Sequence, residues 1–254
     1  MSLKKFNKNG FIIKKNVLSK KDINLLVKMI SFNLNRFKKK TLTNVNILSW
    51  KNKTFTRKIM FFRKQYPKLF SYYYDLIQTN VTLKKITSKE IILKNVAKLM
   101  KIDINSVSHS NSMIRLDGPS DDKNIYGWHQ ERSYYKMNNR SGGIFVWIAL
   151  VDMTKEIGPL EVCSGSHKSG FIKPNVKRKK NGSLQNILPA FYLNKYKKSV
   201  KSIRIKAGDA IFCNMNTFHK SGKNISGLFR MSFISRFHDS HSDDFNSYSD
   251  PGNY

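Results

Sequence analysis

The sequence predicts a mainly β fold with a helical N-terminal part and a jelly-roll core. Apolar residues recur at helical spacing through roughly the first hundred residues. After about residue 105, eight short apolar runs follow, separated by Gly, Pro, Asn and Asp, which is typical of a jelly roll or a related barrel. With 40% hydrophobic residues, a sizeable core can form. We expect one domain over 1–254, with helical support in 1–105, the core in 106–237 and a polar tail in 238–254.

The N-terminal region begins with a predicted short strand over 10–18. Ser19 then predicts a helix start, because it can accept a hydrogen bond from the first turn and Asp22 stands near the capping-box position. The apolar residues of this helix recur at helical spacing: Ile23, Leu26, Val27, Ile30 and Leu34.

Two more helical regions are predicted before residue 105. The first covers 55–79 and is interrupted at Pro67, which lacks the N–H that a helix interior needs. Thr87 and Glu90 have capping-box spacing, so we expect the second to open at Thr87.

The predicted strands after residue 105 are 112–116, 127–131, 143–151, 160–163, 202–205, 210–213, 217–219 and 228–237. A basic loop over 172–200 interrupts this pattern. Cys163 and Cys213 fall in apolar, strand-like runs, so we expect two buried free thiols rather than a disulfide.

The formal net charge is +31, and the excess is concentrated in the first part of the chain. Residues 1–100 carry 24 Lys/Arg against 3 Asp/Glu, whereas residues 101–254 carry 23 against 13. One interpretation is an anionic partner such as nucleic acid or a phosphorylated substrate. The other is compositional, since Lys, Asn and Ile are all abundant, and we favour it. No secretory signal or membrane-length apolar run stands out, so we expect a cytoplasmic location.

His129 and Glu131 carry the strongest chemical signal. They stand two residues apart in the predicted strand 127–131, so both side chains would point to the same face. His219 ends another predicted strand and can supply a third ligand. Two imidazoles and one carboxylate form the ligand set of non-haem Fe(II) oxygenases, which leaves three coordination positions open.

The spacing His-x-Asp/Glu also occurs at His241 and Asp243, in the predicted polar tail. That pair has no histidine downstream to complete a site, so we favour His129 and Glu131; His238 and Asp239 are disfavoured for the same reason. Arg230 lies in an apolar run, where an unpaired charge would be costly. A positive group at this point could hold a dicarboxylate co-substrate.

Several motifs in order resemble the phytanoyl-CoA dioxygenase family of Fe(II)/2-oxoglutarate oxygenases. The matching segments are Gly10–Ser19, Trp128–Glu131, Trp147, Gly158–His167, Gly208–Phe212, His219–Ser221 and Arg230–Ser232. Glu131 replaces the family's usual aspartate and is one methylene longer, so the metal would sit farther from the strand or the rotamer would fold back. The retained carboxylate argues against a halogenase, which typically leaves that position vacant.

The resemblance implies a double-stranded β-helix, or cupin-like, core flanked by helices. It also implies Fe(II) with 2-oxoglutarate and O2 as co-substrates, and hydroxylation with release of succinate and CO2; desaturation or epimerisation needs only a different substrate pose. The implied metal ligands are His129, Glu131 and His219. The implied co-substrate residues are Arg230, Ser221, Trp147 and Ser232.

Tyr126, Tyr134 and Arg115 flank the site and are candidate substrate contacts, although packing or a structural ion pair explains them equally well. Our leading hypothesis is an oxygenase acting on a small, anionic metabolite or biosynthetic intermediate. One alternative is an oxygenase directed at nucleic acid, which we favour less because no run of interleaved basic and aromatic residues is present. Another is a non-catalytic jelly-roll binding module.

Overall fold

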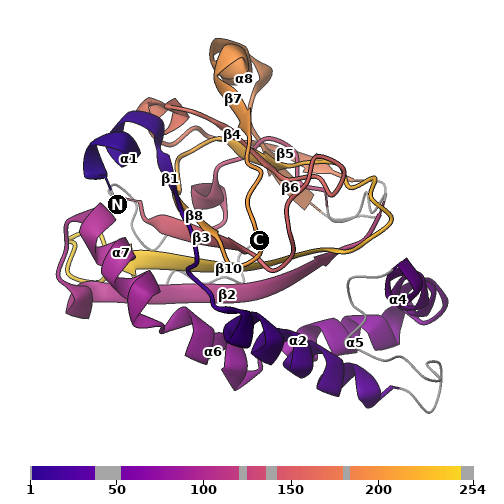
Figure 1. The fold of residues 1–254 in the computed structure, drawn as a ribbon. Helices are drawn as coiled ribbons and strands as arrows, with labels where there is room; N and C mark the ends of the chain where they lie inside the picture. The colour runs from indigo at the N-terminus through magenta and orange to yellow at the C-terminus, as the bar shows by residue number, and fades with distance from the viewer. Residues whose placement is uncertain (1, 38–52, 120–124, 136–141, 180–183, 247–254) are drawn as a thin grey trace.

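A computed structural model describes residues 2–37, 53–119, 125–135, 142–179 and 184–246 of the chain. Helices fill most of the described part of the first hundred residues, and strands dominate from residue 107 onward (Figure 1). The predicted fold class is therefore confirmed.

The helices are α1 (Leu3–Asn9), α2 (Lys20–Asn35), α4 (Lys53–Gln65), α5 (Pro67–Gln78), α6 (Val81–Thr87), α7 (Glu90–Met100) and α8 (Ala190–Tyr196). The strands are β1 (Phe11–Lys14), β2 (Val107–Asp117), β3 (Ile144–Ala149), β4 (Leu160–Cys163), β5 (Asn175–Arg178), β6 (Leu184–Ile187), β7 (Val200–Ser202), β8 (Ala210–Asn214), β9 (His219–Ser221) and β10 (Arg230–Asp239).

Two antiparallel sheets form the core. The larger has the order β1-β8-β3-β10-β2 and the smaller β7-β4-β9. A single bridge between His129 and His219 extends the smaller sheet beside β9. The described strands form open sheets and not a closed barrel.

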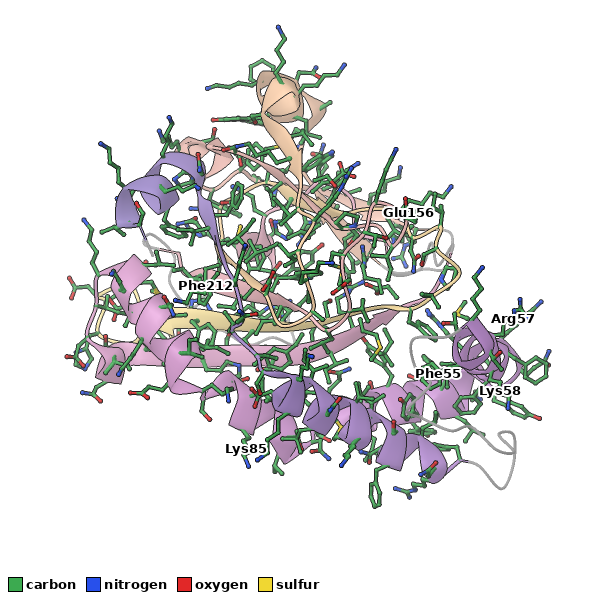
Figure 2. The ribbon with its side chains drawn as sticks, in the orientation of Figure 1. Phe55, Arg57, Lys58, Lys85, Glu156 and Phe212 are labelled. Carbon is green, nitrogen blue, oxygen red and sulfur yellow. The ribbon has the colours of Figure 1, made fainter. Side chains whose placement is uncertain are left out.

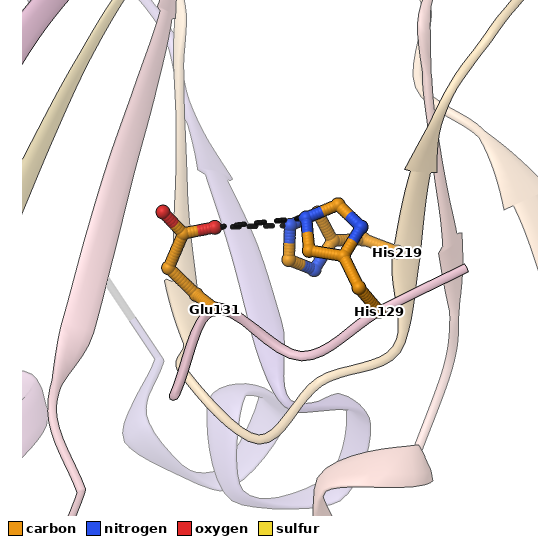
Figure 3. Close-up of side chains that lie close together, drawn as sticks. All are labelled: His129, Glu131 and His219. Atoms are coloured by element: carbon orange, nitrogen blue, oxygen red, sulfur yellow. Dashed lines mark ion pairs between the residues drawn. The ribbon is translucent and has the colours of Figure 1, made fainter. Parts of the chain in front are cut away.

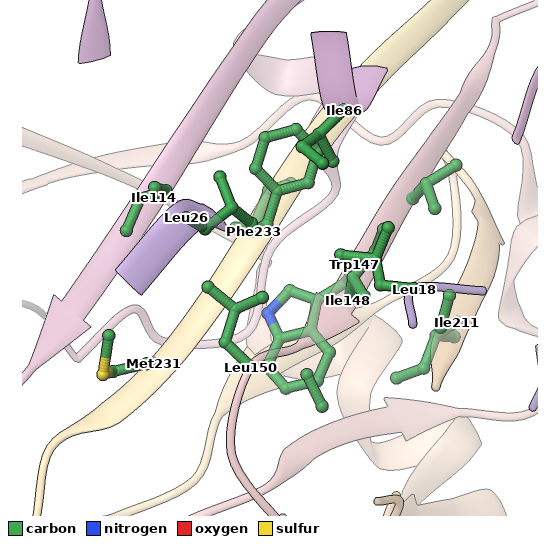
Figure 4. Packing of buried hydrophobic residues seen from close by; sticks show 14 of the residues in the cluster. Leu18, Leu26, Ile86, Ile114, Trp147, Ile148, Leu150, Ile211, Met231 and Phe233 are labelled. Atoms are coloured by element: carbon green, nitrogen blue, oxygen red, sulfur yellow. The ribbon is translucent and has the colours of Figure 1, made fainter. Parts of the chain in front are cut away.

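Strand β10 lies between β3 and β2 in the larger sheet and has two different faces. Side chains alternate along a strand, and Arg230, Ile234 and Arg236 line a cavity on one face. Phe233, on the opposite face, is fully buried in the hydrophobic core. Figure 4 shows it near Leu26 and Ile86 of the helices.

The helical layer covers the outer face of the larger sheet. Helices α5, α6 and α7 contact β2, and α2 packs on α5 and α6 (Figure 1). Burying a large apolar side chain such as Leu26 or Phe233 contributes about 1.5–3 kcal/mol, so this layer holds the sheet in place. Basic side chains such as Arg57 and Lys85 project outward from α4 and α6, whereas Phe212 lies in the interior (Figure 2).

Most predicted N-terminal elements are confirmed. Ser19 and Asp22 form a reciprocal capping box at the start of α2, and Pro67 occupies the first turn of α5, where its missing N–H costs nothing. The prediction for Thr87 was wrong. Thr87 ends α6, its hydroxyl donates to the carbonyl of Leu83, and it lies against the sheet, so α7 begins only at Glu90.

Three predictions in the β region need correction. Residues 127–131 form no strand, because the chain turns into a 3-10 helix at Glu131–Ser133 directly after the bridge at His129. The predicted strands 202–205 and 217–219 are displaced, to Val200–Ser202 and His219–Ser221.

The predicted basic loop over 172–200 was also wrong. Outside 180–183, which lie beyond the described residues, it folds into the β5–β6 hairpin and helix α8. The predicted tail begins too early, since β10 continues to Asp239 and buries His238; residues 247–254 lie outside the described part. Cys163 and Cys213 are buried free thiols, as predicted.

None of the described helices combines the length and the apolar character that crossing a membrane requires.

Candidate metal centre

Two histidines are brought together by the backbone. The N–H of His129 donates to the carbonyl of His219 at 3.0 Å, and the N–H of His219 donates back to the carbonyl of His129 at 3.1 Å. This reciprocal pair places the two imidazole rings with their centroids 4.1 Å apart (Figure 3). Both residues are buried, so the pair lies in the interior and not at the protein surface.

Each histidine is held in one orientation by its own backbone. Nδ1 of His129 lies 2.6 Å from the carbonyl of Gly127, and Nδ1 of His219 lies 2.9 Å from the carbonyl of Thr217. Because a carbonyl only accepts, each Nδ1 carries the proton and each Nε2 keeps its lone pair. Burial lowers the pKa of His129 to about 3, so this imidazole is neutral, which is the form that binds a metal.

Glu131 completes the cluster from the 3-10 turn. Its Oε2 lies 3.3 Å from Nε2 of His219 and 3.8 Å from Nε2 of His129 (Figure 3). Donors that share one ion at about 2.1 Å stand roughly 3 Å apart, so the three atoms fit a single metal with little adjustment. Because Glu131 stands in a turn and not in a strand, its longer side chain reaches the position opposite the histidines.

Arg236, which the sequence interpretation missed, holds the other oxygen of Glu131. Its Nε and Nη2 donate to Oε1 at 2.7 and 2.6 Å. Burial alone would raise the pKa of Glu131, but the adjacent Arg236 guanidinium outweighs it, and the pKa falls well below its usual range. A signal was present in the sequence, because Arg236 is a second arginine in the apolar run, six residues after Arg230 and on the same face.

The cluster opens into a cavity of about 250 Å³ between the two sheets. Most predicted site residues line it together with the triad: Arg115, Tyr126, Tyr134, Trp147, Ser221 and Arg230. Ser232 is not among the lining residues; it is fully buried, and its hydroxyl has no hydrogen-bond partner among the described residues. The sequence interpretation also missed Phe145, Ile234 and Met113, which supply apolar wall.

Arg230 is anchored by protein groups within the cavity wall. Its Nε and Nη2 donate to Oδ2 of Asp117 at 3.0 and 2.7 Å, and its Nη1 donates to the carbonyls of Gly158 and Gly222. These four bonds leave one of the five N–H groups of the guanidinium. The sequence interpretation paired Arg230 with a co-substrate carboxylate alone, but in the structure the carboxylate of Asp117 already pairs with Arg230.

Asp117 also pairs with Arg115, whose Nη2 lies 2.8 Å from Oδ1. Arg115 thus forms the structural ion pair that the sequence left open, while its guanidinium still lies over the Tyr126 ring. Burial acts to raise the pKa of Asp117, but the guanidiniums of Arg115 and Arg230 lower it by more than burial raises it. The carboxyl therefore stays charged.

A glycine at position 158 is required by this arrangement. Gly158 has φ +74°, and a Cβ there would lie 2.6 Å from the carbonyl oxygen of Gly222. Only glycine lets the two segments approach closely enough for both carbonyls to meet Nη1 of Arg230. The turn that begins the Gly158–His167 segment therefore helps to fix the cavity arginine.

The rim of the cavity is aromatic and is tied to the β5–β6 hairpin. The rings of Tyr126 and Tyr134 lie 5.6 and 5.8 Å from that of His129. The hydroxyl of Tyr134 accepts from the backbone N–H of Asn186, and Lys179 lies over the Tyr126 ring. The segment predicted as a basic loop thus holds one side of the cavity.

Among the described residues, neither the second His-x-Asp/Glu match, His241 and Asp243, nor His238 belongs to a metal cluster. His238 is buried at the end of β10, and its Nε2 contacts the hydroxyl of Ser110. Within the described part of the chain, His129, Glu131 and His219 form the one group of three or more such residues that could hold a metal. His129, Glu131 and His219 therefore stay the predicted metal ligands.

The histidines outside the cluster predict acid sensitivity of the metal-free protein. Burial lowers the pKa of both His109 and His238 to about 4, from about 6.5. Their contribution to the free energy of unfolding is complete above pH 6.5 and is lost as the pH falls toward 4, because unfolding then takes up protons. Urea unfolding across this range should show decreasing stability, with a shallower slope for His238→Gln. Parallel slopes for the variant and the wild type would contradict this assignment.

A buried two-histidine, one-carboxylate cluster, open to a cavity between the two sheets of a cupin-like core, defines the class of non-haem iron oxygenases. The sequence profile of the phytanoyl-CoA dioxygenase family matches residues 50–232. The chain belongs to this family, and the predicted resemblance is confirmed.

Solved structures share the fold at low sequence identity. The epimerase SnoN, in complex with Fe3+, alpha ketoglutarate and nogalamycin RO, matches with TM-score 0.61 and 14% identity over 93% of this chain and 82% of that chain. EvdO2 from Micromonospora carbonacea var. aurantiaca, complexed with 2-oxoglutarate, matches with TM-score 0.57 and 16% identity over 96% and 93%. EctD from S. alaskensis, with 2-oxoglutarate and 5-hydroxyectoine, matches with TM-score 0.60 and 15% identity over 93% and 74%. No curated protein matches the sequence.

Family membership and the triad together support iron and 2-oxoglutarate as the cofactors of this chain, as predicted. They support the general class of Fe(II)/2-oxoglutarate oxygenase. Since the similar structures include an epimerase, they do not single out one reaction outcome.

Proposed function

We propose that this protein is a non-haem Fe(II)/2-oxoglutarate-dependent hydroxylase acting on a small anionic metabolite or biosynthetic intermediate, with release of succinate and CO2. The observation that carries the proposal is the convergence of three donor atoms. Nε2 of His129, Nε2 of His219 and Oε2 of Glu131 meet in a buried cavity, with both imidazoles fixed in the metal-binding tautomer.

In this proposal His129, Glu131 and His219 hold the iron. Bound iron, with 2-oxoglutarate as the electron source, supplies the activation of dioxygen that breaks a substrate C–H bond. The protein contributes fixed ligand geometry through the backbone contacts of both histidines, and a cavity wall that limits access of water.

The co-substrate residues act as an anion site at the other end of the cavity. Arg230 offers its remaining N–H and its charge to the far carboxylate of 2-oxoglutarate, and Ser221 adds a hydroxyl at the same wall. Trp147 supplies a flat apolar surface beside them, and Ser232 a buried hydroxyl behind them. Tyr126, Tyr134 and Arg115 would contact the substrate at the rim.

The charge balance of the cavity supports an anionic substrate. Three guanidiniums face it, from Arg115, Arg230 and Arg236, and they pair with two carboxylates, those of Asp117 and Glu131. The two charges of Fe(II) and those of the 2-oxoglutarate dianion cancel. The three guanidiniums in the cavity wall would favour a substrate with a carboxylate or phosphate group.

Co-substrate binding gives the direct test. Anaerobic addition of Fe(II) and then 2-oxoglutarate should produce the visible metal-to-ligand charge-transfer band of a chelated keto acid. Arg230→Ala should need roughly 10–100-fold more 2-oxoglutarate, because hydrogen bonds to a charged group contribute about 1.5–3 kcal/mol. Arg57→Ala, which alters an exposed arginine of α4, is the matched control and should leave the titration unchanged.

If the protein binds iron but shows no charge-transfer band, it has a metal site that does not chelate 2-oxoglutarate. This result would contradict the 2-oxoglutarate proposal. Absence of iron binding would favour the non-catalytic binding module. Once a substrate is found, a product that gains one oxygen atom identifies hydroxylation, whereas loss of two hydrogens or no mass change identifies desaturation or epimerisation.

Three expectations from the sequence stay predictions: the single domain, the cytoplasmic location and the less favoured alternative of a nucleic-acid substrate. The basic side chains described on α4 and α6 point outward from the helical layer (Figure 2). This placement is compatible with the compositional interpretation of the +31 charge.

A further inference from the structure

The guanidinium of Arg236 is committed to a single oxygen atom. Its Nε and Nη2 both donate to Oε1 of Glu131, at 2.7 and 2.6 Å. Oε2 of the same carboxylate receives no donor from Arg236 and lies toward the two imidazoles, 3.3 Å from Nε2 of His219. The two oxygens of Glu131 are therefore used differently, one by the protein and one by the candidate metal centre.

Keeping Arg236 in this position is costly. The residue is only 5% exposed, and its Nη1 is buried without a hydrogen-bond partner among the described residues. The guanidinium lies over the Tyr135 ring, with its carbon 4.6 Å from the centroid. A buried donor left unsatisfied costs about 1–3 kcal/mol, and the cation–π contact offsets part of this. The direct effect of burying this arginine is to fix the orientation of Glu131.

We propose that Arg236 is a positioning residue that restricts Glu131 to one-oxygen coordination of the metal. The inference rests on the proposed function and concerns how the same site keeps coordination positions of the metal open for other ligands. Two histidines and one monodentate carboxylate leave three positions of an octahedral ion open. A carboxylate that used both oxygens would leave two, too few for a chelating keto acid together with dioxygen.

This role also bears on the glutamate at position 131. A glutamate has one more rotatable bond than the family's usual aspartate, so both of its oxygens can swing toward an ion. Arg236 removes that freedom, because two donors hold Oε1 at the arginine while Oε2 faces the two imidazoles. The longer ligand and the buried arginine therefore act together.

Metal titration of the metal-free protein tests the proposal without turnover. Co(II), added anaerobically, is followed through its visible absorption bands in wild type, Arg236→Met and Arg236→Lys. We expect Arg236→Met to bind Co(II) about 10–100-fold more weakly, as is typical when the partner of a metal ligand is removed. Arg236→Lys keeps the charge but loses the fork, and should lie between the two.

A second readout separates positioning from a merely structural role. With Fe(II) at saturating concentration, the charge-transfer band of chelated 2-oxoglutarate should need about 10-fold or more co-substrate in Arg236→Met, because Glu131 can then occupy a second position. The matched control is Arg57→Met, which removes an exposed guanidinium and should behave as wild type in both titrations. In Arg236→Ala, millimolar guanidinium ion should restore much of the Co(II) affinity.

The proposal is overturned if folded Arg236→Met or Arg236→Lys binds Co(II) and 2-oxoglutarate with wild-type affinity. If Arg236→Met does not fold, Arg236→Lys decides, since it keeps a buried cation beside Glu131. Failure of wild type to bind Co(II) would defeat the proposed function itself. Wild-type binding together with unaffected Arg236 variants would defeat this inference alone.

Discussion

His219→Ala should abolish tight binding of Fe(II) and, with it, turnover of 2-oxoglutarate. The substitution removes one of three converging donors, so the loss should exceed the roughly 10–100-fold typical of removing only a partner of a ligand. The fold should survive, because the reciprocal hydrogen bonds with His129 use backbone atoms that alanine retains. Equilibrium dialysis with Fe(II) and a succinate assay give the two measurements.

His241→Ala is the matched control for this experiment. His241 belongs to the second His-x-Asp match and is exposed, so its loss should change neither iron binding nor turnover. Iron retained in His219→Ala and lost in His241→Ala would reverse the assignment of the metal centre.

Asp117→Ala should cause the largest loss of stability among the cavity variants. The substitution leaves Arg115 and Arg230 buried with like charges and no shared carboxylate. Removing one partner of a buried ion pair costs about 3–5 kcal/mol. In a chain of this size, this corresponds to a decrease in Tm of roughly 6–20 °C. Thermal unfolding of the metal-free protein measures it.

The 2-oxoglutarate dianion should recover part of this loss in the presence of metal. In Asp117→Ala, the co-substrate becomes the main anion beside Arg230, so its addition should raise Tm more than it does in wild type. Glu90→Gln is the control, since it breaks a solvent-exposed pair with Lys94 and should leave Tm nearly unchanged. A Tm for Asp117→Ala equal to that of the control would show that the ion pairs do not stabilise the fold.

Local signals were enough to predict much of the fold. Capping at Ser19, the break at Pro67 and the long apolar runs of β3 and β10 depend on neighbouring residues in the sequence. The prediction at Thr87 was wrong because its spacing to Glu90 suits a helix cap. In the structure, Thr87 packs against the sheet, and its hydroxyl contacts the carbonyl of Leu83 and the hydroxyl of Ser235. The β5–β6 hairpin was missed because its strand β5 is exposed and shows no apolar alternation.

The candidate metal cluster could be picked out from the sequence for a different reason. Its residue types are chemically specific, and the signal did not depend on whether positions 127–131 form a strand. The partners of the charged groups could not be predicted in the same way. Asp117 and Arg230, like Glu131 and Arg236, are more than a hundred positions apart. The pairing of β10 with β2 brings Asp117 to Arg230, whereas Glu131 reaches Arg236 from the turn that follows the His129–His219 bridge.

The β10 strand has a consequence for how this chain can vary in evolution. Arg230 and Arg236 share one face of the strand only because they stand six positions apart, an even number. One inserted or deleted residue between them would turn one guanidinium toward the helices and break its buried ion pair, with Asp117 if Arg230 turns or with Glu131 if Arg236 turns. We therefore expect length changes among homologous chains to fall in the β5–β6 hairpin or the turn before Arg230. The segment 230–236 should keep a constant length even where its side chains differ.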